Sequence, residues 1–197
     1  MSAIQMLLPG AEYKYIGDST NCPYGEKSDE DLMRIVRRHV DDLKNWGAKI
    51  IVIACNTATT RCIEKLRHEY PELDFVGTEP AVKLAIDSGA KKVLVMATPG
   101  TIHSERMAHL IEENENKNRR IDLLACAGLA DAIETNDNIK NKLDLILADI
   151  SRDYDAVVLG CTHYSLIKDI IQEYFKQAKL IDGNDGVARR VLEVYNH

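Results

Sequence analysis

The sequence lacks several features that would each assign it to a well-known class of protein. It has no run of about 18 apolar residues, so we expect no membrane span. It has no block of lysine and arginine, and its net charge of −6 argues against a nucleic-acid partner. Its first residues show no basic start and no small-residue cleavage pattern, so we expect no secretion signal.

The five cysteines show no short metal-binding spacing. Zinc takes three or four ligands, and neither a CxxC nor an HxxxH pattern accompanies these thiols, so we expect no metal site. An odd number of thiols without a disulfide framework is typical of a reducing compartment, which favours the cytoplasm. The cysteines are Cys22, Cys55, Cys62, Cys126 and Cys161.

Apolar runs alternate with amphipathic segments along nearly the whole chain. Uninterrupted β-branched runs are typical of parallel strands that are covered on both faces. Strands that alternate with helices predict an α/β fold with parallel sheets. We expect strands at residues 12–16, 49–54, 74–77, 92–97, 121–125, 156–159 and 179–181.

One internal repeat divides the chain. Ile51–Thr57 and Val157–His163 are each an apolar strand followed by a small residue, a cysteine and small polar residues. The two cysteines lie 106 residues apart, about the size of a small domain. We expect two similar, pseudo-two-fold-related lobes, each a parallel sheet with flanking helices. The first lobe comprises residues 1–90 and 186–197, and the second comprises residues 91–185.

Both repeated cysteines follow a strand, where parallel sheets bind ligands. The dipole of the helix expected after Cys55 would lower the pKa of that thiol, and the free N–H groups of its first turn can hold a carboxylate. His163 stands two residues after Cys161 and can share a proton with it. Each motif alone also fits a buried, inert cysteine and a capping histidine. Two matching motifs favour one site with two working thiols.

Several segments resemble signature segments of the glutamate racemases, a family of the cofactor-independent aspartate/glutamate racemase superfamily. The resemblance covers essentially all the residues. It is carried in order by Gly17–Asp18, Pro23–Ser28, Ala54–Thr59 and Gly160–Tyr164, and more loosely by Thr98–Ser104, Cys126–Leu129 and Ile181–Asn184.

The resemblance implies racemisation of glutamate without a cofactor, supplying D-glutamate for peptidoglycan. A homodimer is one option for the assembly of this chain. It implies that Cys55 and Cys161 are the acid/base thiols on opposite faces of the substrate and that His163 assists Cys161. The implied substrate-binding residues are Pro23, Tyr24, Gly25, Asn56, Thr57, Thr98, Thr101 and Thr162.

Some of these residues have an alternative interpretation from the sequence. Thr98 and Thr101 fit turn capping as well as binding, and Cys-Pro-Tyr-Gly is by itself a good turn sequence. Glu134 fits a solvated helix residue better than a carboxylate at the edge of the site.

The sequence departs from the family at its start. Family members begin with an apolar strand and an Asp-Ser-Gly-x-Gly-Gly turn, whose Asp serves the first thiol, and Met1–Gly10 corresponds to the helix that follows that turn. We therefore expect the first lobe to lack its first strand and the activity to be impaired. The alternatives are an amino-acid-binding protein without turnover, a related aspartate racemase, and a coding start upstream of Met1.

Overall fold

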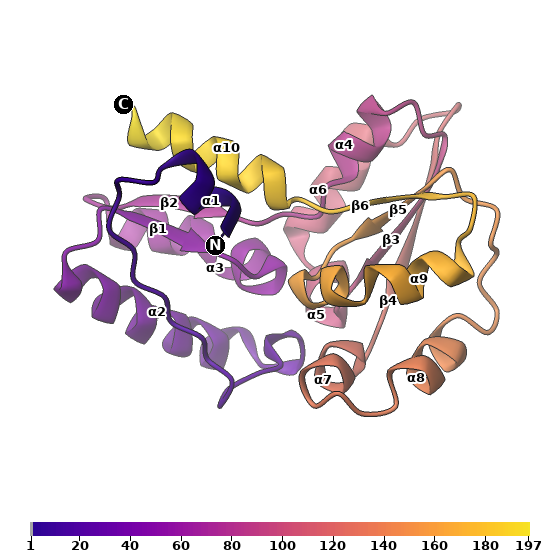
Figure 1. Cartoon of the computed structure of the whole chain (residues 1–197), viewed down its shortest axis with the longest axis horizontal. Helices are drawn as coiled ribbons and strands as arrows, with labels where there is room; N and C mark the ends of the chain where they lie inside the picture. Colours follow the sequence, from indigo (N-terminus) through magenta and orange to yellow (C-terminus); the bar gives the residue numbers. More distant parts are fainter. Residues whose placement is uncertain (1) are drawn as a thin grey trace. The chain divides into compact units, whose positions relative to one another are not determined.

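The computed structural model describes residues 2–197, with Ser2 described by its backbone alone. The chain divides into two compact units, which can be followed in Figure 1: a first unit of residues 2–79 and 183–197, and a second unit of residues 80–182. Each unit contains a parallel sheet with helices packed on it, which confirms the expected α/β fold. No helix of residues 2–197 is both long and apolar enough to cross a membrane.

The first unit is built on a two-stranded parallel sheet, in which Ile50 lies opposite Asp74 and Ile53 lies opposite Gly77. The expected strands at residues 49–54 and 74–77 are therefore present. The elements of this unit are α1 (Ser2–Leu7), the 3-10 helix η1 (Tyr24–Glu26), α2 (Asp29–Trp46), β1 (Ile50–Ile53), α3 (Asn56–Glu69), β2 (Asp74–Gly77) and α10 (Asn184–Tyr195).

The core of the first unit lies between the sheet and two helices. Leu32, Val36 and Val40 recur at four-residue spacing, so they form an apolar stripe along α2. Together with apolar side chains of α3, they pack against Ile51 and Ile53 of β1. α10 contacts both strands and also α1, so the C-terminal helix is part of the first unit (Figure 1).

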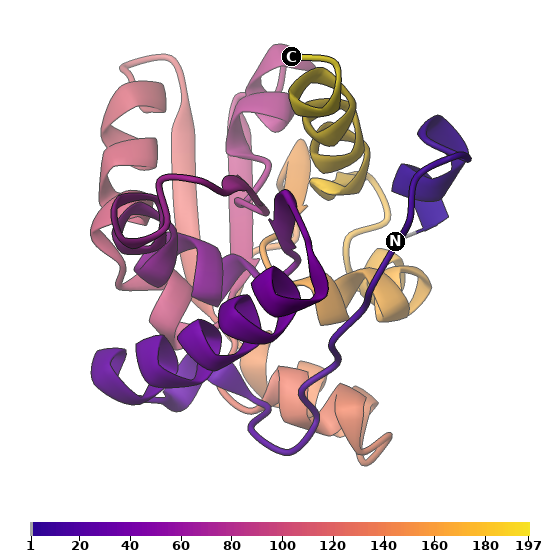
Figure 2. The ribbon, with the colours of Figure 1, turned by 90° about the vertical axis from the view of Figure 1, so that its left-hand side faces the viewer.

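The strand expected at residues 12–16 is wrong. The structure has no helix or strand between α1 and η1, where the chain runs as an extended coil in both views (Figures 1 and 2). Tyr15 is 71% exposed, and the Tyr13 hydroxyl donates to the carbonyl oxygen of Leu8. Alternating polar and apolar residues can fit a strand, but they do not supply the neighbouring strand that it must pair with.

The second unit is built on a four-stranded parallel sheet in the order β4-β3-β5-β6. Its strands are β3 (Lys92–Ala97), β4 (Arg120–Ala125), β5 (Ala156–Leu159) and β6 (Lys179–Ile181), close to the expected ranges. Its helices are α4 (Val82–Asp87), α5 (Pro99–Ile102), α6 (Glu105–Asn114), α7 (Leu129–Glu134), α8 (Ile139–Ile146), the 3-10 helix η2 (Thr162–Ile167) and α9 (Lys168–Tyr174).

Helices cover both faces of this sheet. Successive side chains of a strand point to opposite faces. Leu94 and Met96 of β3 therefore lie in one core cluster with apolar residues of α7, α8 and α9. Val93 and Val95 lie in another cluster with apolar residues of α4 and α6. This arrangement explains why β3 is an uninterrupted apolar run in the sequence.

The unit boundaries differ from the expected division. They fall at 79/80 and 182/183, whereas the sequence suggested 90/91 and 185/186. The main difference is α4, whose Val82 and Ala85 are fully buried in the cluster with Val93 and Val95. This helix therefore belongs with the sheet of the second unit. The sequence marks where the helix ends but not which sheet its apolar face covers.

Candidate active site

Cys55 stands two residues after β1 and is the N-cap residue of α3. Its backbone is extended, with φ −146° and ψ 120°. Its side chain is half-buried against the apolar core of the first unit, as is that of Tyr24. The end of the strand and the start of the helix thus fix the direction of this thiol.

The acidity of the Cys55 thiol differs from the expectation based on the helix dipole. Burial raises the pKa of Cys55, and hydrogen bonds from the backbone N–H groups of Ala58 and Thr57 and from the Thr57 hydroxyl lower it only in part. The expected lowering of the pKa is therefore wrong. These N–H groups of the first turn of α3 favour the thiolate form of Cys55, but their effect is smaller than that of burial.

Asn56 follows Cys55 and is only 4% exposed. Within the described residues 2–197, its side-chain oxygen Oδ1 is buried without a hydrogen-bond partner. A buried acceptor left unpaired costs about 1–3 kcal/mol. This oxygen can therefore accept a hydrogen bond from an N–H group of a ligand, and it belongs to the residue that follows the thiol of the first unit in the sequence.

Cys161 has the corresponding place in the second unit. It stands two residues after β5 and is the N-cap residue of η2, with φ −141° and ψ 135°. Gly160 before it donates its backbone N–H to Met96 O at 2.8 Å. A Cβ atom on Gly160 would lie 2.9 Å from Ala97 Cβ and 3.0 Å from Met96 O, so only glycine fits without displacement.

A hydrogen-bonded chain leads from Cys161 to a carboxylate. His163 Nδ1 lies 3.8 Å from Cys161 Sγ, and His163 Nε2 lies 2.6 Å from Glu134 Oε2. Glu134 is the last residue of α7, and its side chain is 40% exposed. Glu134 is exposed and lies on a helix, as expected, but its carboxylate also bonds to the His163 imidazole and so fixes the orientation of that ring.

The turn of Pro23, Tyr24 and Gly25 lies in the first unit, where η1 contacts α3. The Tyr24 hydroxyl donates to Asp18 Oδ2 at 2.8 Å, and His39 Nε2 lies 2.9 Å from the same oxygen. Burial raises the pKa of Tyr24, and the neighbouring Asp18 raises it further. The phenol therefore stays protonated at neutral pH and donates its hydrogen to Asp18.

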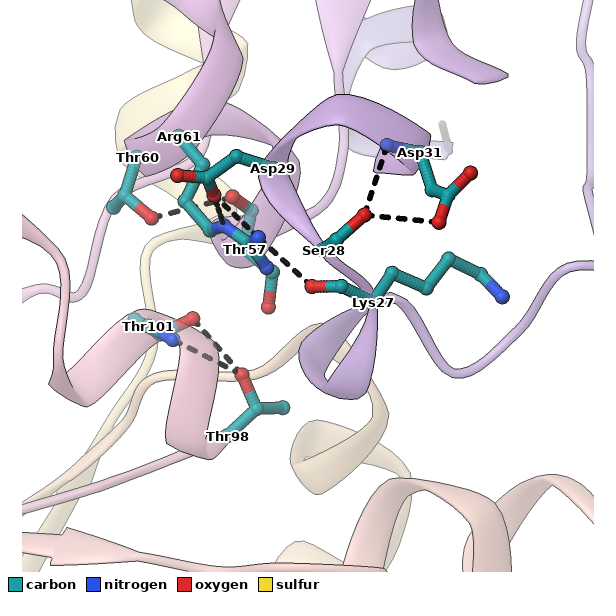
Figure 3. Close-up of polar contacts among 9 residues, drawn as sticks. All are labelled: Lys27, Ser28, Asp29, Asp31, Thr57, Thr60, Arg61, Thr98 and Thr101. Carbon is teal, nitrogen blue, oxygen red and sulfur yellow. Dashed lines mark hydrogen bonds and ion pairs between the residues drawn. The ribbon is translucent and has the colours of Figure 1, made fainter. Parts of the chain in front are cut away.

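Arg61 of α3 holds the residues after this turn, as Figure 3 shows. Its Nε donates to Asp29 Oδ1 at 2.6 Å, and its Nη2 donates to the carbonyl oxygen of Lys27 at 2.8 Å. The N-cap residue of α2 lies between these two partners: Ser28 Oγ accepts the N–H of Asp31. The start of α2 is thereby fixed to the helix that carries the first thiol.

Thr98 and Thr101 belong to the second unit and lie at the start of α5 (Figure 3). Thr98 Oγ1 accepts the N–H of Thr101 at 3.3 Å and lies 3.1 Å from Thr101 Oγ1. Both side chains are buried. The capping interpretation is therefore confirmed for Thr98, and a role in substrate binding stays a prediction.

The structure groups the sequence-predicted site residues by unit. The first unit contains Cys55, Asn56, Thr57 and the Tyr24 turn, and the second contains Cys161, His163, Thr162, Thr98 and Thr101.

Cys62 and Cys126 are buried, and burial raises the pKa of Cys62 to about 11 and that of Cys126 to about 12. These two thiols are therefore protonated and packed at neutral pH. The sequence indicated no role for His39, and it favoured a solvated helix position over a position at the edge of the site for Glu134.

Comparison with known proteins places the chain in a family. Residues 2–191 match the Asp/Glu/Hydantoin racemase family. A glutamate racemase of Clostridium perfringens is 37% identical over 194 residues, which cover 94% of this chain and 74% of that relative. A glutamate racemase of Clostridium acetobutylicum is 35% identical over 198 residues, which cover 96% of this chain and 77% of that relative.

Solved structures agree with this assignment. Escherichia coli glutamate racemase, solved in complex with L-glutamate and the activator UDP-MurNAc-ala, matches with a TM-score of 0.85 at 30% identity, over 99% of this chain and 76% of that one. A glutamate racemase isoform of Bacillus anthracis matches with a TM-score of 0.83 at 29% identity, over 100% of this chain and 76% of that one. The chain therefore belongs to the Asp/Glu/Hydantoin racemase family, and its enzyme type is that of the glutamate racemases, which are amino-acid isomerases.

Proposed function

We propose that this protein racemises glutamate without a cofactor, by a two-thiol acid/base mechanism, and so supplies D-glutamate for peptidoglycan. The observation that carries the proposal is the chain from Cys161 through His163 to Glu134. An imidazole oriented by a carboxylate is suited to take a proton from a thiol and to return it. Glutamate is proposed as the substrate because the similar proteins are named glutamate racemases.

In this mechanism one thiolate takes the α-proton of glutamate, and the electron pair of the broken C–H bond stays on the α-carbon. The thiol on the opposite face then gives its proton to that carbon, which forms the mirror-image product. Cys55 and Cys161 exchange protonation states in the process, and solvent resets them before the next turnover. The reaction therefore needs no redox partner.

The carbanion needs electrostatic support, since an α-proton beside a carboxylate is weakly acidic. The unpaired Asn56 Oδ1 supports a role in accepting the substrate ammonium. Thr57 and Thr162 are assigned to the same end of the substrate, which carries the α-ammonium and α-carboxylate groups. The turn of Pro23, Tyr24 and Gly25 is assigned to the side-chain carboxylate. The donors are the backbone N–H groups of Tyr24 and Gly25, because the Tyr24 hydroxyl donates to Asp18.

Turnover is expected to be slow on the Cys55 side. The groups that lower the pKa of this thiol are two backbone N–H groups and the Thr57 hydroxyl, and none of these three groups is a base. Burial raises the pKa of Cys55, so most of the thiol is protonated at neutral pH. The reaction belongs in a reducing cytoplasm, and the free state of all five cysteines is consistent with that.

Proton exchange tests the proposal. The protein is incubated with L-glutamate in deuterated water while NMR follows the α-proton and circular dichroism follows D-glutamate. We expect loss of the α-proton together with inversion. Binding of glutamate without exchange would instead support an amino-acid-binding protein. Faster exchange with aspartate than with glutamate would support an aspartate racemase.

A further inference from the structure

The Asp18 carboxylate is the centre of a hydrogen-bond cluster in the first unit. Its side chain is 8% exposed, and it accepts from the backbone N–H and the amide group of Asn21 at 3.1 and 2.9 Å. Tyr24 and His39 both bond to its Oδ2 atom, at 2.8 and 2.9 Å. These hydrogen bonds hold the pKa of Asp18 below its usual range although burial raises it, so the group is ionised at neutral pH.

His39 is the member of this cluster that comes from a different element. Asp18, Asn21 and Tyr24 lie within seven residues of one another, whereas His39 projects from the middle of α2 and its side chain is 17% exposed. Its neighbour Val40 is buried in the core of the unit, so the position of the ring is set by the packing of α2. A fixed N–H donor therefore meets the carboxylate from the side of the helix.

The geometry matters for recognition of an anion. Asp18 holds the hydroxyl of Tyr24, and Tyr24 precedes Gly25 in the turn assigned to the substrate's side-chain carboxylate. An ionised Asp18 without a compensating donor would repel a second carboxylate nearby. Without His39, only the Asn21 amide and the Tyr24 hydroxyl would bond to Oδ2, so this oxygen and the Tyr24 ring would be held less firmly.

We propose that His39 is a positioning residue for the substrate. It holds Asp18 in place by a hydrogen bond, so that the Tyr24–Gly25 turn presents its backbone N–H groups to the carboxylate of an acidic amino acid. The inference rests on the proposed function for the substrate, and its geometric part rests on the cluster alone. His39 touches Asp18 and not the reacting atoms, so it acts on binding rather than on chemistry.

The other side of the turn has an independent anchor. Arg61 holds the carbonyl oxygen of Lys27 and the carboxylate of Asp29, so α2 stays attached to α3 when His39 is changed (Figure 3). Loss of His39 should therefore loosen the turn without unfolding the unit.

The test compares three variants of the full chain. His39→Leu removes the donor at similar volume, His39→Gln keeps an N–H donor, and Arg38→Leu changes the exposed neighbour on the same helix. Binding of L-glutamate is measured by calorimetry, and KM and kcat are measured by α-proton exchange. A hydrogen bond to a charged group supports an effect of about tenfold. We expect His39→Leu to raise Kd and KM about tenfold with kcat within about twofold. We expect His39→Gln to recover most of the loss and Arg38→Leu to match the parent.

A double-mutant cycle and an NMR readout complete the test. If His39 and Tyr24 act through the same carboxylate, His39→Leu combined with Tyr24→Phe should weaken binding by less than the product of the single effects. The amide resonances of Tyr24 and Gly25 should shift in His39→Leu and stay in place in Arg38→Leu.

The inference would be overturned if a folded His39→Leu protein had the same Kd for L-glutamate as the parent and its Gly25 amide resonance did not shift. If His39→Leu fails to fold, Tyr24→Phe and His39→Gln decide by the same binding and resonance measurements. No saturable glutamate binding by the parent would instead refute the proposed function, and the Gly25 resonance would still decide whether His39 positions the turn.

Discussion

Cys55 and Cys161 take the same place in two different sheets, and their neighbours differ. Each stands two residues beyond a parallel strand and caps a helix with extended backbone. Cys55 is the N-cap of an α-helix of 14 residues, whose first N–H groups lower the pKa of its thiol in part. Cys161 is the N-cap of a 3-10 helix of six residues and lies beside an imidazole. A strand end thus fixes where a thiol stands, and the next few residues decide how it handles a proton.

The largest expected effect comes from removing either thiol, because the comparison assumes that both thiols take part in the reaction. General acid–base groups contribute about 10²–10⁴-fold to a rate. Cys55→Ala and Cys161→Ala should each lower formation of D-glutamate from L-glutamate by about a thousandfold, measured by circular dichroism. Cys62→Ala is the matched control, because Cys62 is a buried core residue of α3 with no assigned role in proton transfer. The rate of this variant should stay within about threefold of the parent rate. Retention of a tenth of the parent rate by either variant would contradict the two-thiol mechanism.

The next largest effect sharpens the difference between the two thiols. His163 and Thr57 hold corresponding positions in the repeat, two residues after each cysteine. Removing the imidazole in His163→Ala should lower kcat/KM about a hundredfold, and removing the hydroxyl in Thr57→Val should lower it about tenfold. Rates with L- and D-glutamate deuterated at the α-carbon would measure both. Equal losses in the two variants would show that the thiols are served alike.

The residue before each cysteine differs between the two units: Ala54 precedes Cys55, and Gly160 precedes Cys161. Gly160→Ala would place a Cβ atom against Met96 O and Ala97 Cβ, so it should destabilise the protein by about 1–3 kcal/mol. Ala54→Gly only adds backbone freedom, which costs about 0.5–1 kcal/mol. Urea denaturation checks both, and a neutral Gly160→Ala would mean that β3 and β5 separate easily at this point.

The smallest effect concerns the carboxylate behind His163. Glu134 is 40% exposed, and water therefore screens its interaction with the imidazole. Glu134→Gln keeps an oxygen acceptor for His163 Nε2, so it should lower kcat by about tenfold or less. Asp131→Asn, at an exposed position of the same helix, serves as the control and should be silent. A loss as large as that of His163→Ala would mean that Glu134 takes part directly in proton transfer.

The sequence predicted the strands of the second unit because both faces of that sheet are covered, which leaves continuous apolar runs such as β3. It failed at residues 12–16, where an alternating pattern has no strand to pair with. It also located both cysteines, because the signal of a strand followed by a small residue and a thiol is local.

The partners of the site could not be predicted in the same way. Glu134 is 29 residues from His163, and His39 is 21 residues from Asp18. The packing of α7 against η2 brings the first pair together, and the second pair forms between α2 and the coil before η1, so no local spacing records either pair. The pKa of Cys55 was mispredicted for a related reason: a sequence indicates the helix dipole but not the degree of burial that outweighs it.

The most direct test of the central claim follows α-proton exchange of L- and D-glutamate separately in deuterated water, with Cys55→Ala and Cys161→Ala beside the parent. If each thiol serves one face, the parent exchanges and inverts both enantiomers, and neither variant inverts. Each variant then exchanges at most one enantiomer, and the two variants retain opposite ones. Exchange of both enantiomers by a single variant, or no exchange by a parent that binds glutamate, would contradict the account.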